Sequence, residues 1–196
     1  MKNIKIKLII GSTRKIRFSE KVCYWTLSVI NNYKDVDIEV LDLRDFLLPF
    51  LEKEENLNEK DLEILNKWKA KINEADGYLI ISPEYNHSFP AVLKNNLDYL
   101  YEEWFYKPVT FISYGSLGGA RSIEQLRLVA IELRLIPLRN SLHLPYEVIK
   151  KDKSNEEIIE ILKNYNEKLD YSFKELLIMA KILKEARLNN SFKELL

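Results

Sequence analysis

The chain has 196 residues, 46% hydrophobic and 31% charged, which is the composition of an ordinary globular domain. Its 30 Lys and Arg residues balance its 30 Asp and Glu residues, so no net charge draws it to nucleic acid or an anionic membrane. One cysteine, Cys23, excludes an internal disulfide, and no apolar run approaches the ~18 residues of a membrane span. We expect one cytoplasmic domain, 1–196, without a metal, a nucleic-acid partner or a membrane partner.

Strand and helix patterns alternate along most of the chain. Short, largely apolar segments predict five strands, over 2–10, 37–43, 78–82, 109–113 and 136–144. Apolar residues at helical spacing predict helices over 18–32, 59–74, 90–98 and 121–134, and a helical tail from about 155 to 186 with a break near Asp170. Parallel strands need crossovers, so this alternation predicts an α/β fold with a doubly wound, five-stranded parallel sheet in a three-layer α/β/α sandwich.

The first strand is followed by a loop rich in hydrogen-bond donors. Ser12, Arg14, Arg17 and Ser19 stand immediately before a predicted helix. Hydroxyl groups, guanidinium groups and the free N–H groups of a helix start all suit phosphate oxygens. The loop matches neither GxxxxGK[ST] nor GxGxxG, which favours a single phosphate group over a dinucleotide. A polar surface loop with a helix cap is the alternative.

A second loop follows the third strand and suits a flat heterocycle. It combines rigid, aromatic and polar residues: Pro83, Glu84, Tyr85 and Asn86. His87 also lies in this loop, but its neighbours offer no nucleophile and no orienting acid, so we predict no catalytic side chain. A turn that packs its aromatic residues on neighbouring helices is the alternative.

A third loop follows the fourth strand and holds three of the five glycines in the chain. Its central residues are Ser116, Leu117, Gly118 and Gly119. Glycine permits positive φ and lets backbone N–H groups approach a ligand closely. Ligands of doubly wound sheets bind beyond the carboxyl ends of the strands, where all three loops are expected to meet. A tight strand-to-helix turn would explain one glycine more easily than three.

Together, the segments GSTRKIRFSEKV, SPEYNHSFPAVLKNNLDYL and SYGSLGGARSIEQLR resemble the motifs of the NADPH-dependent FMN reductase family, over about residues 4–150. The resemblance implies a flavodoxin-like fold, non-covalent FMN, NADPH or NADH as co-substrate, and a small acceptor such as a quinone, free flavin or azo dye. It implies that the FMN phosphate lies against Ser12, Arg14, Arg17 and Ser19. It also implies that the isoalloxazine edge lies against Pro83, Glu84, Tyr85 and Asn86, and the pyrimidine side near Ser116, Leu117, Gly118 and Gly119.

The sequence leaves other features open. Arg121 or Arg17 could bind the 2′-phosphate of NADPH, or could pair with a carboxylate. Members of the family usually form dimers or tetramers, and the aromatic segment 97–104 could contribute to such an interface or could cover the core. An electron-carrier flavoprotein without NAD(P)H activity is the alternative function, although carriers are usually strongly acidic and this chain is neutral. A fold relative that binds no flavin is a third reading.

Overall fold

The computed structural model describes residues 3–149 and 154–195, and its centre is a parallel sheet. The strands follow the order β2-β1-β3-β4-β5, and a short β6 also pairs with β4. Their bounds are Ile4–Ile10 (β1), Val36–Asp42 (β2), Gly77–Pro83 (β3), Pro108–Tyr114 (β4), Ile136–Pro137 (β5) and Leu142–Leu144 (β6). The pairings are parallel, so the predicted doubly wound α/β sheet is confirmed.

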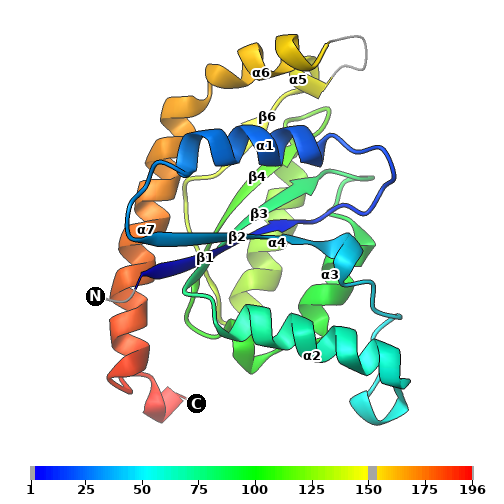
Figure 1. Ribbon diagram of the computed structural model, residues 1–196, viewed down its shortest axis with the longest axis vertical. Coiled ribbons are helices and arrows are strands. Elements are labelled where there is room, and N and C mark those ends of the chain that lie inside the picture. The colour runs from blue at the N-terminus through cyan, green and yellow to red at the C-terminus, as the bar shows by residue number, and fades with distance from the viewer. Residues whose placement is uncertain (1–2, 150–153, 196) are drawn as a thin grey trace.

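Helices cover both faces of this sheet. Their bounds are Ser19–Ile30 (α1), Glu59–Asn73 (α2), Ala91–Asp98 (α3), Ala120–Glu132 (α4), Tyr146–Ile149 (α5), Asn155–Lys163 (α6) and Asn166–Leu188 (α7). Short 3₁₀ turns include Leu43–Asp45 (η1), Glu54–Asn56 (η2), Glu102–Trp104 (η3) and Lys193–Leu195 (η4). In Figure 1, α1 lies on one side of the sheet and α2 on the other. These are the three layers that the sequence predicts.

Two apolar clusters form the core, one on each face of the sheet. Leu8 of β1 packs into the cluster that contains Trp25 of α1, whereas the next residue, Ile9, packs into the cluster of Trp68 and Trp104. Successive side chains of a strand point to opposite faces, so one strand supplies both clusters. Every residue of β3 and β4 is buried, which explains why the central strands are almost continuously apolar in sequence.

The predicted fifth strand, 136–144, is divided in the structure. Pairing with β4 ends after Pro137, where Leu138 N makes a last bond to Val109 O at 2.9 Å. The chain then leaves the ladder, and Thr110 Oγ1 donates to the carbonyl oxygen of Asn140 at 2.6 Å. Pairing with β4 resumes at Leu142. The fifth position of the sheet is therefore shared by β5 and β6.

The helical tail breaks earlier than the sequence predicts. The turn lies between Lys163 and Asn166, where the Asn166 side chain accepts a hydrogen bond from Trp25 Nε1 at 2.8 Å. Asp170, the predicted break, lies inside α7, and its carboxylate accepts hydrogen bonds from Tyr33 and Lys174. Contacts with α1 and with the segment that follows it therefore decide where this tail bends.

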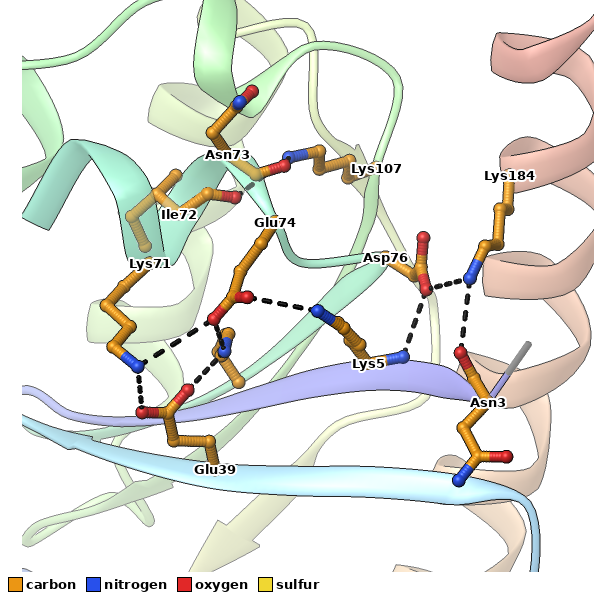
Figure 2. A network of polar contacts seen from close by, with 11 residues as sticks. Asn3, Lys5, Glu39, Lys71, Ile72, Asn73, Glu74, Asp76, Lys107 and Lys184 are labelled. Carbon is orange, nitrogen blue, oxygen red and sulfur yellow. Dashed lines mark hydrogen bonds and ion pairs between the residues drawn. The ribbon is translucent and has the colours of Figure 1, made fainter.

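Ion pairs connect the helices to the amino edge of the sheet (Figure 2). Glu74 accepts hydrogen bonds from Lys7 and, at 3.0 Å, from Lys5. These two bonds lower the pKa of Glu74 to about 2. Asp76 pairs with Lys184 of α7 at 2.7 Å. The network ties α2 and α7 to this edge, and the loops described next lie at the carboxyl edge.

Candidate flavin site at the carboxyl edge

Three loops meet at the carboxyl edge of the sheet: loop A (11–18), loop B (84–90) and loop C (115–119). Loop A contacts loop B where Ser12 Oγ and the hydroxyl of Tyr85 lie 3.1 Å apart. The end of β4 lies against both neighbours, because Ser19 Oγ is 2.6 Å from the hydroxyl of Tyr114 and Glu84 N donates to Tyr114 O at 2.9 Å. The expectation that the three segments converge is confirmed.

Loop A carries Arg14 toward solvent and toward loop B. The Arg14 guanidinium lies 5.7 Å from the centre of the Tyr85 ring, and the residue is exposed. Ser12 and Ser19 are buried instead, with their hydroxyl groups against the two tyrosines. Of these three predicted phosphate-binding residues, Arg14 is the one whose side chain is exposed, and it is also the one that carries a charge.

Arg17 does not have the geometry that the sequence led us to expect. Its guanidinium donates to both carboxylate oxygens of Asp42 and to the carbonyl oxygen of Ser12. Only 1% of the Arg17 side chain is exposed. A guanidinium buried in a bidentate ion pair has its donors already used, so direct contact between Arg17 and a phosphate is not supported.

Loop B is a tight turn at the end of β3. Tyr85 and Ser88 exchange backbone hydrogen bonds of 2.8 and 3.1 Å. Asn86 and His87 between them have φ of 49° and 74°, a left-handed conformation that Asn and His adopt more readily than most residues. Both are exposed, whereas Pro83 is buried as the last residue of β3.

Glu84 anchors loop B to α4. Its carboxylate accepts a hydrogen bond from Arg121 Nε at 2.6 Å and another from Arg121 N at 3.1 Å, at the start of that helix. The Glu84 side chain is 3% exposed. The negative charge of Glu84 therefore stabilises the positive end of the α4 dipole, and the Arg121 guanidinium is engaged in an ion pair with this carboxylate. The ion-pair alternative for Arg121 is the one that the structure contains.

Loop C packs closely on β4, and two of its glycines make this possible. Gly118 and Gly119 have φ of 66° and 74°, and a Cβ on Gly119 would lie 2.0 Å from Ser113 Oγ. A side chain there cannot be accommodated without moving the loop. Ser116 and Leu117 project outward at the tip of the loop and are exposed.

The backbone donors of these loops fit FMN. Within the described residues, the N–H groups from Ser12 to Phe18 donate to no protein acceptor, and neither do those of Asn86, His87, Ser116 and Leu117. A run of available N–H groups before a helix suits phosphate oxygens. Donors on the other two loops suit the electron-rich edge of a flavin ring. The donor set therefore matches the group that the sequence resemblance implies.

Sequence reasoning missed several residues that support the loops. Asp42 and Arg44 hold loop A from the end of β2, and Gln125 of α4 donates to the carbonyl oxygen of His87 at 2.9 Å. His143 of β6 backs loop C, since a Cβ on Gly118 would lie 3.1 Å from His143 Cβ. Asp42 stands at the carboxyl end of a predicted strand, which was a usable signal; Gln125 and His143 carried none.

A cavity of about 740 Å³ lies at the opposite edge of the sheet, between α2 and the C-terminal segment. Four cationic residues line it: Lys69, Lys107, Arg187 and Lys193. Two of them donate to backbone carbonyl groups, since Lys107 Nζ donates to Ile72 O and Asn73 O at 2.8 and 2.9 Å, and Arg187 donates to Tyr106 O at 2.6 Å. Burial lowers the pKa of Lys107 to about 7. Figure 2 shows Lys107 directed at the end of α2, so it caps a helix.

Neither a metal cluster nor a membrane-spanning helix occurs in the described ranges. Over residues 3–149 and 154–195, no group of three or more His, Cys, Asp or Glu side chains could hold a metal ion. Over the same residues, the helices lack the length and the apolar character that a membrane span requires.

Comparison with known proteins places the chain in a family. Residues 4–147 match the family described as NADPH-dependent FMN reductase. An NAD(P)H-dependent FMN reductase of Schizosaccharomyces pombe is 35% identical over 152 residues, which cover 74% of this chain and 76% of that protein. An NADPH:quinone oxidoreductase of Arabidopsis thaliana is 32% identical over 137 residues, 67% of this chain and 69% of the relative.

A solved structure has the same fold. The flavoenzyme NAD(P)H:(acceptor) oxidoreductase FerB from Paracoccus denitrificans superposes with a TM-score of 0.61 and 19% identity, covering 86% of this chain and 98% of FerB. The match over residues 4–147 includes all three loops. This chain belongs to the NADPH-dependent FMN reductase family, with a flavodoxin-like fold.

Proposed function

We propose that this protein is an FMN-dependent NAD(P)H oxidoreductase that takes a hydride from NADPH or NADH and passes electrons to a small acceptor, such as a quinone, free flavin or azo compound. The observation that carries the proposal is the row of available backbone donors on loops A, B and C, in a chain whose residues 4–147 match the FMN reductase family. When bound, FMN supplies the redox chemistry itself.

The protein's own part is to bind and orient. In this proposal, Ser12, Arg14, the N–H groups of loop A and the start of α1 at Ser19 hold the phosphate. The segment Pro83, Glu84, Tyr85 and Asn86 borders the ring edge, with Glu84 acting through the backbone that it positions. The segment Ser116, Leu117, Gly118 and Gly119 lies near the pyrimidine side, where the free N–H groups of Ser116 and Leu117 can stabilise negative charge on a flavin. No side chain serves as a general acid or base.

The visible spectrum of the purified protein tests the cofactor. After incubation with FMN and gel filtration, we expect a flavin absorption band that stays with the protein. A colourless protein that takes up no FMN would contradict the proposal and favour the reading without flavin.

Steady-state kinetics test the activity. We expect oxidation of NADPH or NADH with benzoquinone or free FMN as acceptor, and parallel double-reciprocal lines, because both substrates use one open face in turn. Flavin retention without any nucleotide oxidation would point to an electron carrier. Intersecting lines would contradict the shared face.

Location and assembly belong to the same proposal. The lone cysteine, Cys23, and the use of NAD(P)H favour the cytoplasm.

A homodimer or homotetramer is favoured by apolar side chains exposed on α4, where Leu128 and Ile131 are 66% and 61% exposed. The segment 97–104 contributes less than its sequence suggests, because Trp104 is fully buried and Tyr101 is the exposed aromatic residue. Sedimentation analysis of the full chain, compared with Leu128→Lys, tests the assembly.

A further inference from the structure

Two arginines hold the backbone carbonyl groups of loop A. Arg17 Nη1 donates to the carbonyl oxygen of Ser12. Arg44, in the η1 turn that follows β2, donates through Nη2 to the carbonyl oxygens of Arg14 and Lys15, at 2.5 and 3.0 Å. The carbonyl groups of three of the four residues from Ser12 to Lys15 therefore face the same pair of guanidinium groups.

Two carboxylates hold the arginines in turn. Asp42 accepts from both Arg17 Nη atoms, and also from Arg44 N at 2.9 Å. Glu20 Oε1 accepts from Arg44 Nη1 at 2.7 Å and from Arg17 Nε at 3.3 Å. Burial raises the pKa of Asp42, but the bonds from Arg17 and Arg44 outweigh it and leave the pKa lowered. Two cations and two anions cancel, so the cluster adds no net charge to loop A.

The hydrogen bonds to the carbonyl groups of loop A also fix the direction of the N–H groups that follow them in the chain. In a trans peptide, the carbonyl group of one residue and the N–H of the next point in opposite directions, and the described residues contain no cis peptide. The N–H groups of Thr13, Lys15 and Ile16 are thus directed away from the guanidinium groups. Within the described residues, none of the three donates to a protein acceptor.

We infer that Asp42, Arg44 and Arg17 are positioning residues that hold loop A in its phosphate-binding conformation. The inference rests on the proposed function, because it takes the ligand of loop A to be the FMN phosphate. It gives the arginines a role through the backbone and assigns the phosphate to N–H groups that they direct. Asp42 and Arg44 lie outside the sequence motif and outside every predicted contact.

Affinities for FMN and for riboflavin, which lacks the phosphate, distinguish this role. For Arg44→Ala in the full chain, we expect FMN to bind about tenfold more weakly and riboflavin to bind within about twofold of wild type. For Asp42→Asn, the direction of the change in FMN affinity distinguishes two explanations. The substitution removes a negative charge near loop A, so simple attraction would tighten FMN binding, whereas loss of the support for Arg17 and Arg44 weakens it. We expect weaker binding of FMN and unchanged binding of riboflavin.

Arg187→Ala is the matched control. Arg187 also joins a carboxylate, Asp76 at 3.3 Å, to a backbone carbonyl oxygen, Tyr106 O at 2.6 Å, but it does so at the opposite edge of the sheet. The Arg187→Ala protein should be less stable than wild type, but the ratio of its affinities for FMN and riboflavin should not change. If Arg44→Ala does not fold, Arg44→Lys keeps the charge with fewer donors and should still weaken FMN selectively.

Three outcomes are decisive. Equal losses for FMN and riboflavin, or tighter FMN binding in Asp42→Asn, would overturn the positioning role. Unchanged FMN affinity in Arg44→Ala, or in Arg44→Lys if the alanine variant does not fold, would also overturn the positioning role. If the wild-type chain did not bind FMN, the result would instead contradict the proposed function, so the two failures are distinguishable.

Discussion

The cations of loop A have different environments although they are close in sequence. Arg17 is buried against Asp42, whereas Arg14 is exposed beside Tyr85. Burying a guanidinium is tolerated only when it is paired, and the pairing removes its charge from contact with a ligand. At the scale of the residue, tertiary contacts decide which arginine can contact an anion.

Arg14→Ala should weaken FMN binding by about 1–3 kcal/mol, because it removes one charge-assisted hydrogen bond to phosphate. Fluorescence titration with FMN measures the effect. Lys15→Ala is the control, since Lys15 is an exposed cation next in sequence. Equal affinities in wild type and Arg14→Ala would place the phosphate elsewhere.

Gly119→Ala should destabilise the protein by more than about 2 kcal/mol, because an alanine would combine positive φ with a direct clash against Ser113. Urea denaturation measures the loss. Gly77→Ala is the milder comparison, because its Cβ would meet its nearest neighbours at 3.2–3.3 Å. If both variants lost the same stability, the special role of Gly119 would be wrong.

At the scale of the element, contacts between elements set the ends that periodicity alone placed only approximately. The segment 136–144 is predicted to be one strand, but its pairing with β4 is interrupted between Leu138 and Leu142. The tail helix divides at 164–165, next to the contact between Trp25 and Asn166. Local patterns identify that an element exists, and neighbouring elements decide where it stops.

Glu74→Gln tests the network that joins α2 to β1. The pKa of Glu74 is lowered from 4.5 to about 2, so its ionised form stabilises the fold above pH 4.5 and this contribution is lost as the pH falls toward 2. The side chain is 37% exposed. Solvent screening therefore limits the expected loss at pH 7 to about 1 kcal/mol.

Urea denaturation of wild type and Glu74→Gln across this pH range measures the effect. The difference in unfolding free energy should shrink as the pH falls from about 4.5 to about 2. Glu63→Gln, an exposed change on the same helix, should show no such dependence. A difference that stayed constant with pH would contradict the ion-pair explanation.

At the scale of the whole molecule, one sheet supplies both cores. Leu8 and Ile9 are neighbours in β1 but belong to clusters on opposite faces. Neither face can lose its packing without exposing strands that the other face needs. We therefore propose that residues 1–196 form a single cooperative domain, as the length of the chain predicts.

The tryptophans can test this cooperativity. Trp25 reports on one face, and Trp68 and Trp104 report on the other. Fluorescence of Trp25→Phe and of the double variant Trp68→Phe, Trp104→Phe should each follow circular dichroism through a single urea transition. Different fluorescence and circular dichroism midpoints within either variant would show that the faces unfold separately.

Much of this protein can be predicted from its sequence. Apolar periodicity is a local property, so alternating strands and helices, and with them the doubly wound sheet, are recognisable without coordinates. The three loop motifs lie at strand ends, which parallel topology must bring to one edge. The expectation that Ser12, Tyr85 and Gly118 belong to neighbouring loops follows from those two facts.

Only the tertiary structure decided which groups in those loops are available to a ligand. Arg17 and Arg121 are paired by Asp42 and Glu84, residues that are distant from them in sequence. Arg44 turns the carbonyl groups of loop A to one side, although nothing in the loop motif refers to it. The reason is physical: secondary structure follows from neighbours along the chain, whereas the use of a charge or an N–H group depends on partners that meet only when the chain folds.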